Sequence, residues 1–380
     1  MARLDDICAI NMGQSPDSAS YNENGEGMPF FQGNADFGKI HPKVRVWCSA
    51  PTKIAYAGDV LISVRAPIGA MNIADRECCI GRGLAALTVN EGLCVKDYLW
   101  YAIASKVDEL NSKGTGSTFK AISKGVLAET EIPLPDLNEQ KKIAEQLAKV
   151  DGLIAARKEQ LTKLDQLVKS RFVELFGSIK NNHQRYPVVK IGSCAKLQGG
   201  FAFKSSDYLN DGIRLVQISN VNKDTLDWDS INCVPQAFLQ KYKDFELHVG
   251  DLVLAMTRPV IKSLDAVKIA TVSENDVPSL LNQRVGRFVV DRKKLHSVYL
   301  MVLCQMPEFR EYVEAMSGNS LQPNISSKQV EDYSIVLPPL ALQEQFAAFV
   351  QQTDKSKMAI QQSLNKLETL KKSLMQEYFG

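Results

Sequence analysis

The sequence predicts an α+β protein in which two mixed α/β domains alternate with two long helices that pair as an antiparallel coiled coil about a pseudo-two-fold axis. Three observations predict this class: a gap-free repeat of one segment, a heptad spacing inside each copy, and a looser repetition of the residues ahead of each copy. A chain of 380 residues is also long enough to form two or more separate cores.

The strongest of these observations is the repeat. Residues 134–177 align without a gap with residues 337–380, at a constant offset of 203 residues. A repeat of this length indicates that one structural unit occurs twice. The matching pairs include Leu134/Leu337, Pro135/Pro338, Leu137/Leu340, Gln140/Gln343, Ala144/Ala347, Asp151/Asp354, Leu161/Leu364, Leu164/Leu367, Leu167/Leu370, Ser170/Ser373, Glu174/Glu377, Phe176/Phe379 and Gly177/Gly380.

Each copy of the repeat has the spacing of a long helix. Apolar residues recur at alternating steps of three and four, which is typical of a heptad seam, and about 38 residues would form a rod of about 57 Å. One helix cannot bury its own seam, so we expect the two helices to pair; two unrelated surface helices are the alternative. The expected seam contains Ile143, Leu147, Val150, Ile154, Leu161, Leu164, Phe346, Val350, Ile360, Leu364, Leu367 and Leu374.

Composition narrows the remaining classes. The hydrophobic fraction of 45% is ordinary for a globular protein, and no apolar run reaches the length of a membrane span. The first residues lack the apolar core of a signal peptide. The eight cysteines show no CxxC spacing, so we expect buried thiols in a reducing cytoplasm and no metal site. The net charge of +2 neither favours nor excludes nucleic acid.

The residues ahead of each helix predict two related domains. Short apolar runs separated by turn residues occur in the same order in both, with Arg65 matching Arg258 and residues 80–89 matching residues 281–290. The side chains in the loops differ, as expected when a scaffold is kept and a binding surface changes. We therefore expect a first domain at 1–136, a central long helix at 137–177, a second domain at 178–340 and a distal long helix at 341–380.

This alternation of variable domain and long helix resembles the specificity subunit of type I restriction-modification enzymes. The resemblance covers essentially the whole chain. Asp136 and Glu139 differ from their counterparts Pro339 and Leu342, which changes only the helix starts. The residues that carry the resemblance are IPLPDLNEQKKIAEQL and VLPPLALQEQFAAFV at the helix starts, together with GDVLISVR, CIGRGLAAL, LNQRVGRFVV, GTGSTFKAISK and GNSLQPNISSK.

The resemblance implies a cytoplasmic DNA-binding subunit that is not itself an enzyme and acts in phage defence. Each mixed domain would be a target-recognition domain for one half of a bipartite, asymmetric site in double-stranded DNA, and the helix pair would set the spacer between the halves. The helices would also bind two methyltransferase subunits, which restriction subunits with motor activity would then join. The cofactors S-adenosylmethionine and ATP would belong to these partners, and none to this chain.

The candidate DNA contacts are polar residues in loops or at strand ends, beside glycine or proline. Lysine and arginine bind phosphates, and arginine, asparagine, glutamine, serine and threonine read base edges. Each candidate could instead be a solvated or structurally hydrogen-bonded residue. The candidates are Ser63, Arg65, Arg82, Lys113, Ser117, Thr118 and Lys120 in the first domain, and Thr257, Arg258, Gln283, Arg284, Asn319, Gln322 and Asn324 in the second.

Two other classes of function remain open at this stage. An enzyme would need a catalytic constellation, but the sequence has no GxxxxGK[ST] phosphate loop and no Asn/Asp-Pro-Pro-aromatic motif, and its four histidines are scattered. A coiled-coil scaffold would bind proteins through its domains and would show no preference for DNA sequence. Within the first class, the chain could serve a system with methyltransferase activity alone.

Overall fold

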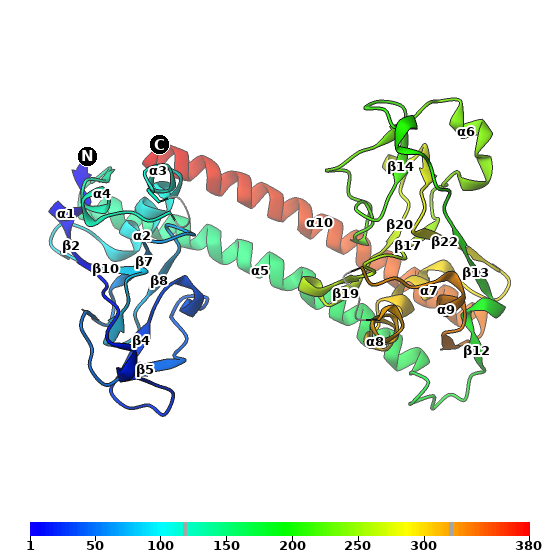
Figure 1. The fold of residues 1–380 in the computed structure, drawn as a ribbon, viewed down its shortest axis with the longest axis horizontal. Coiled ribbons are helices and arrows are strands. Elements are labelled where there is room, and N and C mark those ends of the chain that lie inside the picture. The colour runs from blue at the N-terminus through cyan, green and yellow to red at the C-terminus, as the bar shows by residue number, and fades with distance from the viewer. Residues whose placement is uncertain (117–119, 319–321) are drawn as a thin grey trace. The chain divides into compact units, whose positions relative to one another are not determined.

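The computed structural model describes residues 1–116, 120–318 and 322–380, and these residues divide into two compact units. The first unit combines Met1–Lys158 with Gln362–Gly380, and the second comprises Glu159–Gln361. The two long helices, α5 (Leu137–Phe176) and α10 (Leu340–Phe379), have 40 residues each and contribute to both units (Figure 1). The predicted α+β class, with mixed domains alternating with long helices, is confirmed.

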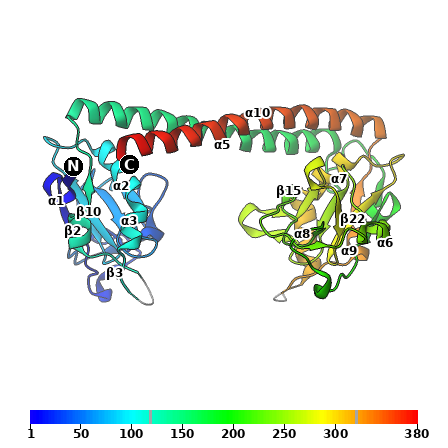
Figure 2. The same ribbon diagram turned by 90° about the horizontal axis from the view of Figure 1, so that it is seen from above.

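The first unit has two main sheets beside its part of the helices (Figure 2). An antiparallel sheet has the order β2-β10-β7-β8 and a second sheet has the order β3-β5-β4-β9-β6. The strands are β1 (Ala2–Arg3), β2 (Cys8–Met12), β3 (Tyr21–Asn22), β4 (Met28–Phe31), β5 (Val46–Cys48), β6 (Ile54–Ala55), β7 (Val60–Ser63), β8 (Met71–Ile73), β9 (Cys78–Ile80), β10 (Leu84–Val89) and β11 (Glu131–Ile132), and β1 pairs with β11. The short helices are α1 (Leu4–Ile7), α2 (Lys96–Ser105), α3 (Val107–Ser112) and α4 (Lys124–Ala128).

The sheet that contains β7 is buried on both faces, which explains its continuous apolar sequence. Successive side chains of a strand point to opposite faces. Val60 and Ile62 accordingly join the core formed with α2 and α5, whereas Leu61 joins a second core with Phe31 and Ile80 of the other sheet. The sheet therefore forms a layer between the helices and the second sheet.

The second unit repeats this plan with additions. Its largest sheet has the order β13-β22-β17-β20-β15, and a smaller sheet has the order β16-β14-β21. The strands are β12 (Val188–Lys190), β13 (Ala195–Gly199), β14 (Ile213–Val216), β15 (Lys223–Asp224), β16 (Cys233–Val234), β17 (Leu252–Ala255), β18 (Val260–Ile261), β19 (Ala266–Val267), β20 (Ile269–Thr271), β21 (Ser279–Leu281), β22 (Val285–Val290) and β23 (Ser334–Val336), with β12 paired to β23 and β18 to β19. The short helices are α6 (Phe238–Lys241), α7 (Ser297–Cys304), α8 (Pro307–Ser317) and α9 (Ser327–Glu331).

In the first unit, α5 and α10 run antiparallel. Tyr378 donates a hydrogen bond from its hydroxyl to Oε1 of Gln146 at 2.9 Å, and the Nζ of Lys371 lies 2.6 Å from Oδ1 of Asp151. Residues further along α5 thus contact residues that come earlier in α10. Phe379 packs on Tyr98 of α2, with 5.3 Å between the ring centroids, which attaches the end of α10 to the domain.

The second unit contains the equivalent pairing. Phe176, at the end of α5, packs edge-on against Tyr299 of α7 and Phe346 of α10. Further along, the Nζ of Lys357 lies 2.6 Å from Oδ1 of Asp165, whose other oxygen accepts a hydrogen bond from Lys223 at 3.1 Å. Burial opposes ionisation of Asp165, but these two lysines outweigh it and hold the pKa of its carboxyl below the usual value.

The expected seam residues all lie at buried or half-buried positions. The buried members are Ile143, Leu147, Val150, Phe346, Val350, Leu364 and Leu374. The half-buried members are Ile154, Leu161, Leu164, Ile360 and Leu367. The eight cysteines are also buried, all as free thiols, as expected from their spacing.

A buried glutamine attaches each domain to the start of a long helix. The amide of Gln140 accepts a hydrogen bond from the backbone N–H of Val95 at 2.8 Å and donates to the carbonyl oxygens of Leu93 and Pro135 at 3.1 and 2.8 Å. Tyr98 adds a hydrogen bond from its hydroxyl to the carbonyl oxygen of Pro133 at 2.8 Å. Gln140 is fully buried, so its hydrogen bonds have no replacement from water.

The same attachment recurs in the second unit. Gln343, also fully buried, accepts a hydrogen bond from the N–H of His296 at 2.9 Å and donates to the carbonyl oxygens of Lys294 and Pro338 at 3.0 and 2.8 Å. Tyr299 donates to the carbonyl oxygen of Val336 at 2.5 Å. The same three hydrogen bonds therefore explain why both copies of the repeat have glutamine at this position, as Gln140 and Gln343.

We expect Leu364→Asp to lower the free energy of unfolding of the purified chain by about 3 kcal/mol, because the substitution buries an unpaired carboxylate. Urea denaturation monitored by circular dichroism measures this change. Leu370→Asp is the matched control on the same helix, since Leu370 is 46% exposed and Leu364 only 4%. An equal loss of stability in both variants would contradict the assignment of Leu364 to the helix interface.

Candidate nucleic-acid interface

Three cationic side chains of the first domain lie on adjacent loops. Arg65 follows β7, and Arg82 precedes β10. The N–H of Val64 donates to the carbonyl oxygen of Gly83 at 2.9 Å, and the N–H of Ala66 donates to the carbonyl oxygen of Lys120 at 3.0 Å. These backbone bonds hold the loops of Arg65, Arg82 and Lys120 side by side, and all three side chains are exposed.

Arg65 and Arg82 also line one cavity of about 530 Å³. Its other lining residues are Ser15, Pro16, Ser18, Tyr21, Gln32 and Gly83. Gln32 was not among the predicted contacts; it directly follows β4, and its side chain offers both a donor and an acceptor. The only signal in the sequence was its position at a strand end, which many structural residues share.

Two predicted contacts of the first domain, Ser63 and Lys113, have partners within the chain. Ser63 is 1% exposed, and its hydroxyl donates to the carbonyl oxygen of Arg65 at 2.8 Å, a structural hydrogen bond within the loop. Lys113 is exposed, but its amine pairs with Glu109 at 2.6 Å. Ser117 and Thr118 lie outside the described residues.

In the second domain, Arg258, Gln283 and Arg284 occupy the equivalent loops. The N–H of Met256 donates to the carbonyl oxygen of Arg284 at 2.7 Å, and the N–H of Arg258 donates to the carbonyl oxygen of Pro323 at 2.7 Å. All three predicted side chains are exposed. Arg258 and Arg284 have φ angles of +48° and +67°, a region that side chains other than glycine seldom adopt.

Two of the remaining candidates of the second domain, Thr257 and Asn324, have structural partners. Thr257 is 2% exposed and donates its hydroxyl to Oδ1 of Asn324, which is a structural hydrogen bond within the domain. The Nδ2 of Asn324 donates to the carbonyl oxygen of Gln322 at 2.8 Å, which occupies the other end of that amide. Gln322 is exposed, whereas Asn319 lies outside the described residues.

The backbone corrects one correspondence between the two domains. The sequence matched Arg65 with Arg258. In the structure, Arg65 forms an antiparallel bridge with Ala121, and Thr257 forms the equivalent bridge with Asn324. Ala121 and Asn324 are equivalent residues of the repeat, at its offset of 203. Arg65 therefore corresponds to Thr257, and Arg258 corresponds to Ala66. The match between residues 80–89 and 281–290 agrees with the strand registers of β10 and β22.

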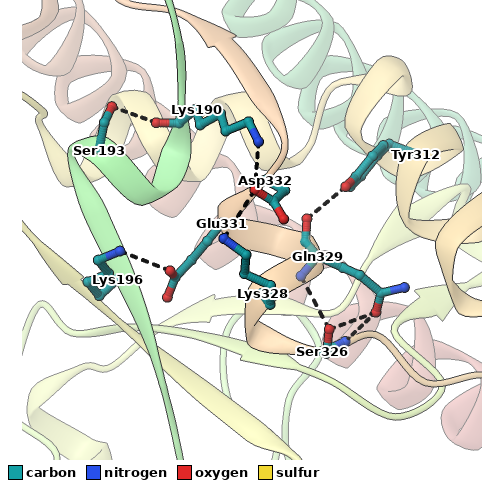
Figure 3. Close-up of polar contacts among 9 residues, drawn as sticks. All are labelled: Lys190, Ser193, Lys196, Tyr312, Ser326, Lys328, Gln329, Glu331 and Asp332. Atoms are coloured by element: carbon teal, nitrogen blue, oxygen red, sulfur yellow. Dashed lines mark hydrogen bonds and ion pairs between the residues drawn. The ribbon is translucent and has the colours of Figure 1, made fainter.

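The loop that contains Gln322 and Asn324 leads directly into α9, whose start is capped. The hydroxyl of Ser326 accepts a hydrogen bond from the N–H of Gln329 at 3.2 Å, and Oε1 of Gln329 accepts from the N–H and the hydroxyl of Ser326, both at 2.8 Å (Figure 3). Such a reciprocal cap fixes the direction in which the chain enters a helix.

Acidic residues at the other end of α9 attach it to neighbouring strands. Glu331 accepts a hydrogen bond from Lys196 at 3.1 Å, and Asp332 accepts one from Lys190 at 2.8 Å (Figure 3). Glu331 also accepts a hydrogen bond from the N–H of Leu197 at 3.1 Å. Burial opposes ionisation of Glu331, but the hydrogen bond from Leu197 and the charges of Lys196 and Lys328 together outweigh it and hold the pKa of that carboxyl below its usual value. The lysine–carboxylate contacts of α9 are thus structural.

Neither a metal-binding group of acidic, histidine or cysteine side chains nor a helix long and apolar enough to cross a membrane occurs in residues 1–116, 120–318 and 322–380.

Comparison with known proteins identifies the family. A family model described as the type I restriction modification DNA specificity domain matches residues 1–166 and 184–371. The putative type I restriction enzyme MjaX specificity subunit of Methanocaldococcus jannaschii is 42% identical over 160 residues, which are 42% of this chain and 38% of that protein. The MjaVIII specificity subunit of the same organism is 29% identical over 290 residues, which are 73% of this chain and 68% of that protein.

A solved structure shows the same fold over the whole chain. The S subunit of the type I restriction-modification system from M. genitalium superposes with a TM-score of 0.59 at 15% identity, covering 100% of this chain and 95% of that one. The match of the family model extends over both mixed domains and most of both long helices. The chain therefore belongs to the family of type I restriction-modification specificity subunits.

Proposed function

We propose that this chain recognises the target DNA of a type I restriction-modification complex and catalyses no reaction itself. In this proposal its two domains bind the halves of a bipartite, asymmetric site. The observation that carries the proposal is that the DNA specificity domain model matches twice, once on each domain. Relatives named as specificity subunits of type I restriction enzymes support the same role.

Unequal half-sites follow from the loops of the two domains. The backbone hydrogen bonds that hold these loops are shared, whereas their exposed side chains differ: Arg65, Arg82 and Lys120 in one domain and Arg258, Gln283 and Arg284 in the other. Base edges are distinguished by the donors and acceptors that side chains present. Two domains with one scaffold and different side chains would therefore read different sequences.

Binding of two methyltransferase subunits is supported by a repeated surface of the long helices, which we call the stripe. In α5 the stripe contains Lys163, Leu167, Ser170 and Glu174, and in α10 it contains the identical residues Lys366, Leu370, Ser373 and Glu377. Steps of four, three and four residues place the four side chains on one face of a helix. All eight are exposed, so packing within the chain does not explain their identity.

The leucines of the stripe are its most informative members. Leu167 is 48% exposed and Leu370 is 46% exposed, and an apolar side chain at such a position gains free energy when a partner covers it. Two identical surfaces fit two copies of one partner. We infer that each copy of the stripe binds one methyltransferase subunit, to which S-adenosylmethionine would belong; restriction subunits that use ATP would join the assembled complex.

Leu167→Asp and Leu370→Asp should each remove one methyltransferase subunit from the complex, and the double variant should remove both, because a carboxylate at the contact is desolvated without a partner. Native mass spectrometry of the co-purified complex measures the stoichiometry. Leu153→Asp is the matched control, since Leu153 is also 48% exposed but its counterpart in the repeat is Ser356. Full assembly of the double variant would refute this docking surface.

The helices should also set the distance between the half-sites. We expect removal of residues 156–162 and 359–365, one heptad from each helix, to shorten the spacer by about three base pairs, because seven residues span about 10 Å and each base pair about 3.4 Å. Both half-sites should stay unchanged. The methylated motif of cells that express the shortened chain reports both quantities, and altered half-sites with an unchanged spacer would contradict the proposal.

The direct test of the function compares genomic methylation in cells with and without this gene. Single-molecule sequencing should show that methyladenine disappears from one split, asymmetric motif when the gene is deleted, and returns when it is restored on a plasmid. Expression of the partner methyltransferase must be verified in both strains. If the methylation pattern is unchanged while the partner is expressed, the chain does not direct methylation.

A further inference from the structure

Each domain presents two arginines on the same two neighbouring loops. In the first domain, Arg65 follows β7 and Arg82 precedes β10. In the second domain, Arg258 lies in the loop that follows β17, and Arg284 directly precedes β22. We call these the first and second arginine pairs. The loops of each pair are joined by a backbone hydrogen bond, from Val64 to Gly83 or from Met256 to Arg284.

The two pairs differ by one residue in both loops. Arg65 corresponds to Thr257, and Arg258 to Ala66, as the backbone bridges establish. Arg82 corresponds to Gln283, and Arg284 to Gly83, by the common register of β10 and β22. Both domains thus have two arginines on these loops, but each arginine of the second domain lies one position later than its counterpart in the first.

Close packing explains the position of the arginine in the first domain. A Cβ atom added to Gly83 would lie 2.4 Å from the carbonyl oxygen of Gln32, so no side chain fits there and the arginine stands one residue earlier. In the second domain, Arg284 occupies this place with a φ angle of +67°. Arg258 likewise adopts a φ of +48°. A left-handed backbone costs conformational energy and persists where the surrounding structure holds it, as at binding sites.

The guanidinium groups of both pairs are available to a ligand. All four arginines are exposed, and within the described residues none of their side chains makes a hydrogen bond or ion pair. Several other arginines are held by carboxylates: Arg45 pairs with Asp36, Arg287 with Asp251 and Arg310 with Asp265. Unpaired cations on adjoining loops repel one another, so an electronegative ligand placed among them would be bound favourably.

We propose that each arginine pair reads guanine in the half-site of its own domain. The proposal rests on the proposed function and specifies its chemistry. The guanidinium group donates two parallel hydrogen bonds to O6 and N7 of guanine in the major groove, a pattern that no other base offers. Because neighbouring residues direct their side chains differently, a shift of one residue places the guanine differently in each half-site.

The same arginines could instead bind phosphate groups of the DNA. Substitution by lysine distinguishes phosphate binding from guanine reading. Lysine keeps the charge that attracts phosphate but lacks the planar fork that fits guanine. Lysine also needs the same backbone conformation as arginine at positions 258 and 284, so the exchange adds no backbone strain. A contact with phosphate should therefore tolerate lysine, and a contact with guanine should not.

The experiment measures the methylated motif in cells that express the partner subunits with the wild-type chain or with Arg65→Lys, Arg82→Lys, Arg258→Lys or Arg284→Lys. Substitutions in the first pair should relax a guanine position in one half-site only, and those in the second pair a guanine position in the other. Discrimination against other bases at that position should fall roughly five- to 150-fold, the contribution of one bidentate contact.

Arg185→Lys is the matched control, because Arg185 is exposed and has a positive φ of 57° but lies outside both pairs. It should leave both half-sites unchanged. Circular dichroism and co-purification with the partner subunits establish that each variant folds and assembles. Retention of full sequence discrimination by the lysine variants, or a uniform loss of methylation at an unaltered motif, would overturn guanine reading. Absence of any split motif in wild-type cells would instead refute the proposed function.

Discussion

The structure depends on a buried amide at the start of each long helix. Gln140 and Gln343 are fully buried and each makes three hydrogen bonds, to the residues ahead of α2 or α7 and to the proline carbonyl before the helix. Removing such an amide would leave buried backbone groups without partners, which costs far more free energy than a surface hydrogen bond provides. Within each unit, the domain and the helix are therefore joined by polar contacts that permit one geometry.

This attachment allows the recognition loops to diverge. Because the sheets and helices of each unit hold the loop ends through backbone hydrogen bonds, the side chains between those ends are free to change. Arg82 and Gln283 illustrate the result: they occupy one backbone position with different chemistry. The hydroxyls of Ser63 and Thr257 are buried and hydrogen-bonded within their own domains.

The long helices combine two requirements in one sequence. Their inward faces bury leucines and phenylalanines, with Asp151 and Asp165 paired to lysines of α10 so that charge at the interface is compensated. Their outward faces carry the stripe, whose residues are identical in both copies although packing does not demand it. Binding of the same partner by both helices would be a sufficient reason for these residues to be identical.

The sequence alone determined the fold class, the extent of both long helices and their apolar faces, because hydrophobic periodicity is a local property that the repeat shows twice. It did not determine which polar loop residues face solvent. Ser63 and Thr257 are indistinguishable from ligand contacts in the sequence, and only the folded structure shows that both are buried. The place of Gln32 beside Arg82 likewise depends on tertiary structure, because the meeting of separate loops decides it.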